Sequence, residues 1–165
     1  MNSFGKIIEI LILVILLFIM PMKNSVEKKD DIVQTTVTTY TAYFTDAIRS
    51  KGYIDRDMYE EFVRWLESSG YLYQVNLTHY KKIYYTDESG QAFDMDYEYV
   101  SSEVIIEQLY EGDERYDFLK GDFIGVKVTS KNETSGQLIS RSLLGVDNNG
   151  GIYVNYGGVI RDEIK

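Results

Sequence analysis

The sequence predicts an α+β protein, in which an N-terminal transmembrane helix is followed by a domain of two helices packed on an antiparallel β-sheet. Residues 7–22 read IIEILILVILLFIMPM and contain one charged residue, Glu9. Two later segments repeat apolar residues at helical spacing, and most of the second half of the chain alternates as strands do. We therefore expect a short N-terminal segment at 1–6, a transmembrane helix at 7–22, a charged spacer at 23–31 and an extracytoplasmic α+β domain at 32–165.

The apolar run is long enough to serve as a membrane anchor. A helix over 7–22 spans about 24 Å at 1.5 Å per residue, and flanking residues extend it toward the roughly 30 Å hydrocarbon core of a bilayer. A cleaved secretory signal would be followed by a small-x-small site, whereas the sequence continues PMKNSVEKK. A soluble core helix would need partners on every side. A retained single-pass anchor fits these residues best.

The lysines around the apolar run bear on its orientation in the membrane. Lys6 precedes the run, and Lys23, Lys28 and Lys29 follow it, so the positive-inside rule alone would place the large domain in the cytoplasm. That rule weakens for long translocated domains, and a tyrosine-rich sheet is typical of an exported module. We expect a cell-membrane protein with its C-terminal domain outside the cytoplasm.

The first helix of the domain is predicted from DDIVQTTVTTYTAYFTDAIRSKG, where apolar residues recur three or four positions apart and Gly52 ends the pattern. The second follows Asp55, an N-cap residue, with Ile54 placed to contact Tyr59. Its apolar face combines four residues: Met58, Phe62, Trp65 and Leu66. We expect Phe44, Phe62 and Trp65 to be buried between the helices and the sheet.

Most of the remaining chain is predicted to be β-structure. The segments 71–86 and 91–100 form a hairpin around a turn at 87–90. A short helix follows Ser101 or Ser102, and 121–130 is a strand. The segment 137–145 fits a strand or a short helix, and 152–160 is a strand after a turn at 147–151.

Composition excludes several function classes. The absence of cysteine rules out disulfides, thiolate metal sites and a cysteine nucleophile. The net charge of −9 disfavours nucleic acid, which requires a basic face. The one histidine, His79, lies within a strand without an evident nucleophile, as a structural histidine would. With no catalytic or cofactor motif in the chain, we expect a protein that is not an enzyme and needs no cofactor.

Three acidic residues share one face of the predicted hairpin. Asp94, Asp96 and Glu98 alternate along FDMDYEYV, and oxygen ligands from one face suit Ca²⁺. The other interpretation is a solvated face with cross-strand charge pairs to Lys81 and Lys82. We favour the charge pairs and therefore predict no metal site.

The segment SFGKIIEILILVILL resembles the N-terminal segment of type IV pilins and their relatives. In those proteins a glutamate near the mature N-terminus guides subunit addition. The resemblance implies processing after Gly5 and an assembly role for Glu9, although Glu9 would become the fourth mature residue instead of the fifth. The alternative is that Glu9 is solvated at the depth of the lipid headgroups.

Together with FTDAIRSKG, GDFIGVKV and YGGVIRDE, this segment makes the chain similar to TadE-like or minor-pseudopilin-type proteins of tight-adherence (Flp) pili and related secretion systems. The resemblance implies a pilin-like domain, no catalytic centre and an assembly role, with other pilus or secretion subunits as partners through the N-terminal helix. The alternative function is an extracytoplasmic ligand-binding or sensor module, whose tyrosine-rich sheet holds a ligand.

Overall fold

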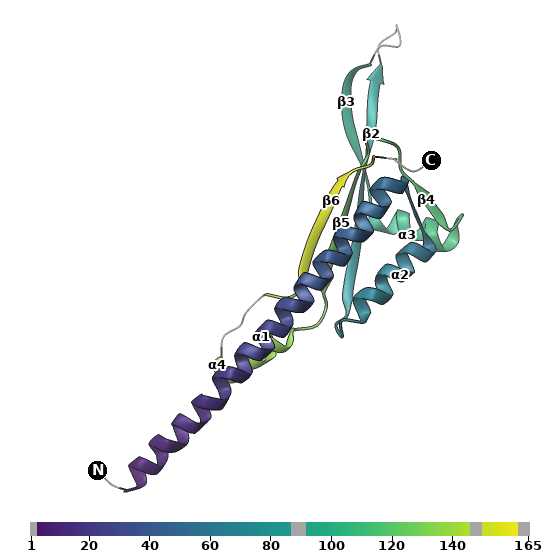
Figure 1. Cartoon of the computed structure of the whole chain (residues 1–165). Coiled ribbons are helices and arrows are strands. Elements are labelled where there is room, and N and C mark those ends of the chain that lie inside the picture. Colours follow the sequence, from purple (N-terminus) through teal and green to yellow (C-terminus); the bar gives the residue numbers. More distant parts are fainter. Residues whose placement is uncertain (1–2, 87–91, 146–149, 162–165) are drawn as a thin grey trace.

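The computed structural model describes residues 3–86, 92–145 and 150–161, and it joins one long helix to an antiparallel sheet (Figure 1). The N-terminal end of the long helix projects beyond the other described elements. The α+β class and the long apolar N-terminal helix expected from the sequence are confirmed. In chain order the elements are α1 (Ser3–Lys51), β1 (Tyr53–Asp55), α2 (Arg56–Glu67), β2 (Tyr73–Thr86), β3 (Ala92–Val100), α3 (Ser102–Glu111), β4 (Arg115–Asp117), β5 (Phe123–Ser130), α4 (Ser135–Leu144) and β6 (Tyr153–Val159).

Helix α1 is continuous over 49 residues, about 74 Å at 1.5 Å per residue. The charged spacer expected at 23–31 is part of this helix, so no break separates the apolar run from the domain. Lys23 and Glu27 fit the helical spacing, with an ion pair of 3.4 Å between Nζ and Oε1. The predicted end is confirmed, because Gly52 has a φ of +74° and its N–H donates to the carbonyl of Ile48 at 2.8 Å.

The main sheet has four antiparallel strands in the order β3-β2-β5-β6. Leu77 of β2 lies opposite Val126 of β5, which lies opposite Tyr156 of β6. Residues in register share a face, and the face that carries Leu77 and Val126 is buried. Helix α1 lies against β6 and β5, and α3 lies against β2. The other face of the sheet, called the outer face below, carries exposed side chains such as Tyr80 and Tyr99.

A second sheet pairs β1 with β4 and positions α2. Ile54 lies opposite Tyr116, and the predicted N-cap is confirmed because Asp55 Oδ1 accepts a hydrogen bond from Met58 N at 2.8 Å. These strands were not predicted, since three residues are too few to show alternation. Helix α2 packs mainly on α1 and β1. The two helices expected on the sheet correspond to α1 and α2; of these, α1 packs on the main sheet, and the second helix on it is α3.

The segment left open as strand or helix forms α4. Thr134 caps it by accepting from Gln137 N at 3.3 Å, and the Gln137 side chain accepts from Thr134 N at 2.7 Å. Gly145 ends the helix with a φ of +64°. Before α3, Ser101 makes no side-chain cap. The turn expected at 87–90 lies outside the described residues, as do positions 147–149 of the turn expected at 147–151.

The buried core lies between α1, α2, α3 and the inner face of the sheet. Phe44 and Phe62 are buried as predicted, with stacked rings 4.1 Å apart between centroids. The prediction for Trp65 is wrong, because its side chain is 47% exposed. Successive residues on a helix point about 100° apart, and it is Leu66 that faces the core. Trp65 instead stacks on Tyr40 at the surface, 4.9 Å between centroids.

Candidate functional site

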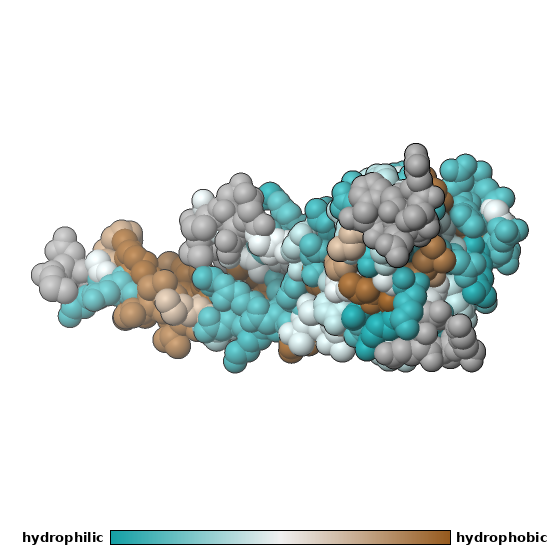
Figure 2. Space-filling model, turned by 90° about the horizontal axis from the view of Figure 1, so that it is seen from above, coloured by the Kyte–Doolittle hydropathy of each residue, from teal (hydrophilic) through white to brown (hydrophobic). Residues whose placement is uncertain are grey.

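The projecting end of α1 presents its apolar side chains to the surroundings. From Phe4 to Met22, its large apolar side chains are exposed or at most half-buried. Figure 2 shows them as a hydrophobic region at one extremity of a mostly hydrophilic surface. Within the part of the chain that the structure describes, one helix, α1, is both long enough and apolar enough to cross a membrane. Such a surface needs lipid or other apolar helices around it.

Both residues of the predicted assembly site lie in the first turns of this end. Gly5 and Glu9 are exposed, and their four-residue spacing places them about one helical turn apart on the same side. A Cβ atom added to Gly5 would meet nothing within 4 Å. The fold therefore leaves this stretch of helix open to contact with another chain.

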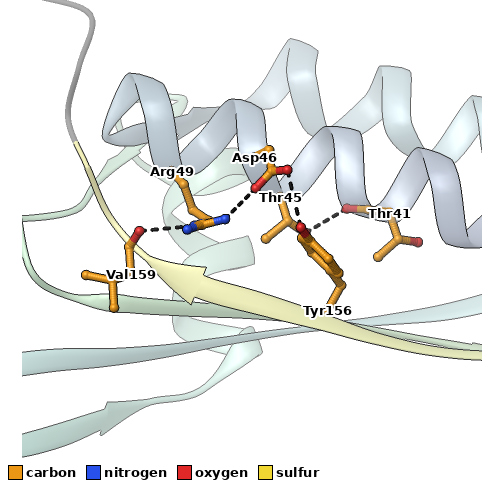
Figure 3. Close-up of polar contacts among 6 residues, drawn as sticks. All are labelled: Thr41, Thr45, Asp46, Arg49, Tyr156 and Val159. Atoms are coloured by element: carbon orange, nitrogen blue, oxygen red, sulfur yellow. Dashed lines mark hydrogen bonds and ion pairs between the residues drawn. The ribbon is translucent and has the colours of Figure 1, made fainter.

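The other half of α1 is held against β6 by a polar seam (Figure 3). Arg49 Nε donates to the carbonyl of Val159 at 3.0 Å, and its Nη1 lies 2.5 Å from Asp46 Oδ1. Tyr156 donates to Asp46 Oδ2 at 3.3 Å. A Cβ atom on Gly158 would lie 2.5 Å from the Arg49 guanidinium. The absence of a side chain at Gly158 thus lets Arg49 lie across the strand.

Buried threonines let α1 approach the sheet without leaving polar atoms unsatisfied. Thr41 and Thr45 are fully buried. Their hydroxyls donate to the carbonyls of Val37 and Thr41, each at 2.7 Å. A hydroxyl that bonds the preceding turn of its own helix needs no partner from the sheet. These threonines lowered the helix propensity of the sequence, yet they suit a buried helix face.

A second set of contacts joins α1 to the rest of the domain nearer the apolar end. The Gln34 side chain acts like a peptide group toward Tyr153: its Nε2 donates to the Tyr153 carbonyl at 2.9 Å, and its Oε1 accepts from Tyr153 N at 3.2 Å. Asp30 accepts from Tyr71 Oη at 2.9 Å and from Gly136 N at 2.7 Å. A carboxylate at the N-terminus of α4 is favoured by the helix dipole. The seam therefore runs from Asp30 to Arg49.

The acidic row of the hairpin is present and only partly paired. Glu98 lies opposite Lys81, but Asp96 and Asp94 lie opposite Ile83 and Tyr85. Lys82, the second expected partner, belongs to the outer face. Within the described residues, no group of three His, Cys, Asp or Glu residues is placed to hold a metal ion. The register thus places Glu98 alone of the three opposite one of the expected lysines.

His79 is buried in a polar network that joins β2, β4 and the start of β5. Its Nε2 lies 2.9 Å from Asp122 Oδ2, and its Nδ1 lies 2.8 Å from Tyr116 Oη. Asp122 also accepts from the backbone N–H groups of Lys82 and Leu119, at 2.9 and 2.8 Å. Burial and the nearby Asp122 carboxylate raise the pKa of Tyr116. With both ring nitrogens occupied, His79 is placed to fix structure.

Two further surfaces are exposed; sequence reasoning missed the first and predicted the second only as a tyrosine-rich sheet. A groove of about 380 Å³ lies between α1 and α2, with Tyr40, Phe44, Phe62 and Trp65 among its lining residues. The other surface is the outer face of the sheet, which gathers exposed tyrosines from β2 and β3. The sequence signal for it is the alternation Tyr80, Lys82, Tyr84, which the prediction of a tyrosine-rich sheet did not single out.

Comparison with known proteins adds no relative to these observations. No family model, no curated protein and no solved structure matches this chain.

Proposed function

We propose that this chain is a membrane-anchored structural or assembly subunit of a pilus or secretion apparatus, similar to a minor pseudopilin, with its α+β domain outside the cytoplasm. The observation that carries the proposal is the continuity of α1, which runs without a break from an exposed apolar end to a half docked on an antiparallel sheet. Such a helix couples the domain rigidly to whatever surrounds the apolar end.

The apolar end of α1 has two environments available to it. In a bilayer it contacts lipid chains, and in an assembly it contacts the equivalent helices of neighbouring subunits. Transfer from lipid to a helix bundle involves little change in hydrophobic free energy, so packing and polar contacts decide it. This property suits a subunit that waits in the membrane and later joins a bundle.

Glu9 is the residue through which we expect the bundle to be recognised. A carboxylate in an apolar run is costly unless it is paired or lies at the headgroups. In a bundle it would pair with the amino terminus of a neighbouring subunit. The exposure of Glu9 on α1 supports this role.

Substitution of Glu9 tests the assembly role. Glu9→Gln keeps the size and removes the charge, and Glu9→Leu favours membrane retention. We expect both variants to stay in the membrane fraction and to lose co-purification with partner subunits. Glu27→Gln is the matched control, because Glu27 lies on the same helix outside the apolar run. Undiminished recovery of partners with Glu9→Leu would contradict the assembly role.

Sidedness can be tested with single cysteines, because the natural chain has none. Tyr43→Cys places a thiol on an exposed position of the domain. We expect a membrane-impermeant maleimide to label this variant in intact cells as fully as in lysed cells. Labelling only after lysis would place the domain in the cytoplasm and overturn the proposed orientation.

A second candidate, an anchored extracytoplasmic ligand-binding module, is favoured by one observation. The outer face of the sheet exposes several tyrosines and is not needed for the contacts that hold α1. The two functions are compatible, because they use opposite ends of the molecule.

A further inference from the structure

The outer face of the sheet differs in charge from the rest of the protein. Its residues follow from the strand register: even positions of β2 and odd positions of β3, β5 and β6. Among the described residues of these strands, this face carries two lysines, Lys82 and Lys127, and no carboxylate. The carboxylates of β3 all point to the other face. A face without acidic residues stands out on a chain of net charge −9.

Aromatic rings form a continuous row across three strands of this face. The Tyr80 ring lies 5.7 Å from that of Tyr99 and 6.1 Å from that of Phe123, between centroids. Val159 continues the row on β6, opposite Phe123. The row therefore crosses the strands of the sheet from one edge to the other.

Two facing glycines leave the outer face of the sheet beside Phe123 without side chains. Gly125 lies opposite Gly157, and a Cβ atom on Gly157 would lie 3.0 Å from Phe123 Cζ and 2.7 Å from the Ile124 carbonyl. The Phe123 ring thus occupies the space that a side chain at Gly157 would take. The result is a nearly flat aromatic surface, formed by Tyr80, Tyr99 and Phe123 and called the platform below.

The platform extends along the β2–β3 hairpin, which projects from the domain in Figure 1. Tyr97 lies opposite Lys82 and Met95 opposite Tyr84. The Lys82 ammonium lies 4.8 Å from the centre of the Tyr84 ring. The four tyrosines of the platform, Tyr80, Tyr84, Tyr97 and Tyr99, are 39–59% exposed. Their rings and hydroxyls are therefore open to a ligand.

We propose that this aromatic platform binds an anionic polysaccharide. The apolar C–H faces of sugar rings stack on flat aromatic rings, whose faces carry negative charge density, and tyrosine hydroxyls exchange hydrogen bonds with sugar hydroxyls. The Lys82 ammonium pairs with a carboxylate or phosphate of the polysaccharide. A linear polymer matches a row that is open at both ends, whereas a small ligand would favour an enclosed pocket.

The charge distribution and the strand edge favour this occupant over another copy of the chain. Two copies meeting through this face would bring their Lys82 and Lys127 side chains together with no carboxylate among the described residues of the face to pair them, and the uncharged polar tips of the platform offer no acidic group to a basic protein. Strand addition at β3 is opposed by its own aspartates: Asp94 and Asp96 accept from the N–H groups of Met95 and Tyr97 at 2.8 and 2.7 Å. Those N–H groups point to the open edge, because alternate residues pair with β2.

The platform can be tested with the full-length protein in zwitterionic nanodiscs. The probes are immobilised polygalacturonate, hyaluronate and a phosphomannan, with methyl-esterified polygalacturonate as the uncharged match of the first. We expect retention on at least one anionic polymer and weaker retention on the ester. Tyr80→Ala with Tyr99→Ala should weaken binding about tenfold or more, because two stacking contacts are lost. Lys82→Gln should reduce the preference for the anionic polymer over its ester.

Tyr43→Ala is the matched control, since Tyr43 is an exposed tyrosine of α1 that lies off the platform; its binding should equal that of the natural chain. If the double variant loses its fold, as judged by Trp65 emission, Tyr84→Ser with Tyr97→Ser replaces it. The proposal is overturned by absence of binding to all three anionic polymers, by equal binding of the platform variants, or by platform-dependent self-association in place of polymer binding. These readouts do not involve Glu9, so failure here leaves the assembly role standing, and the reverse also holds.

Discussion

The two halves of α1 contain the same kinds of apolar residue in different surroundings. Phe18, in the N-terminal half, is 74% exposed, whereas Phe44, in the C-terminal half, is 5% exposed. Both belong to one unbroken helix. The helix therefore forms regardless of whether the domain covers it, and the domain covers only the half that begins near Asp30.

The difference lies in where polar residues fall around the helix. Between Ile10 and Met22 the N-terminal half is apolar on all sides, as expected of a helix that meets lipid or other helices. The C-terminal half mixes apolar residues with threonines whose hydroxyls bond the carbonyl four residues earlier. This holds on the exposed side, as at Thr36, and on the buried side, as at Thr41. One face can thus enter the core while the other meets water.

The largest expected effect comes from making the same substitution in each half. Phe44→Ala should lower the free energy of unfolding by about 3–5 kcal/mol, because it empties a stacked, buried site. Phe18→Ala should leave that free energy unchanged, since the domain does not contact Phe18. The measurement is urea unfolding of the full chain in detergent micelles, followed by the emission of Trp65, the single tryptophan. Equal losses for the two variants would contradict the division of α1.

The docked half depends on a sheet whose geometry is fixed by the buried network of His79 and Asp122. Asp122→Asn keeps the volume but places an amide N–H₂ where hydrogen-bond donors now point. An unsatisfied buried group costs about 1–3 kcal/mol, and we expect a loss of that size in urea unfolding. Asp117→Asn, at an exposed carboxylate of β4, should change stability by less than about 0.5 kcal/mol. Similar values for both would mean that the network carries little of the stability.

A smaller effect on stability is expected at the Arg49 end of the seam, near the C-terminus of α1. Arg49→Ala removes the hydrogen bond to the Val159 carbonyl and the ion pair with Asp46. Because this pair is partly exposed, we expect a loss of about 1 kcal/mol. Gly158→Ala should approach the same loss, since its Cβ would displace the guanidinium, and in the Arg49→Ala background it should cost less. Additive losses would show that the two positions act independently.

The sequence predicted the elements with strong local signals and missed those defined by tertiary contacts. The apolar run, the Asp55 cap and the Gly52 stop depend on neighbouring residues, and the fold has all three. Trp65 was misplaced because helical periodicity defines an apolar face but not how much of it is covered. The prediction treated the charged spacer at 23–31 as separate from the helix because the composition changes from apolar to charged there. The backbone nevertheless stays helical through these residues.

The candidate functional residues likewise include some that a local sequence motif predicts and some that depend on tertiary contacts. Gly5 and Glu9 were found from a local motif, and the structure leaves both exposed. The aromatic platform could not be found from one segment, because it needs the pairing of Tyr80 with Tyr99 and Phe123 across three strands. Strand register is a tertiary property, and one residue of slip would move every one of these rings to the other face.

The smallest expected effect defines where the docked half begins. Asp30→Ala removes the carboxylate that accepts from Gly136 N and Tyr71 Oη. A charge at a helix N-terminus contributes about 0.3–1 kcal/mol, and salt screens it. We therefore expect faster amide hydrogen exchange in α4, a small loss of stability, and a smaller difference from the natural chain in high salt. Asp31→Ala, at the neighbouring exposed residue, should leave α4 unchanged.

If α4 responds to Asp30 and not to Asp31, the docked half reaches to within eight residues of Met22. About 12 Å of helix, at 1.5 Å per residue, would then separate the domain from the predicted membrane span. Exchange in α4 that is the same in both variants would place the start of the docked half closer to Gln34.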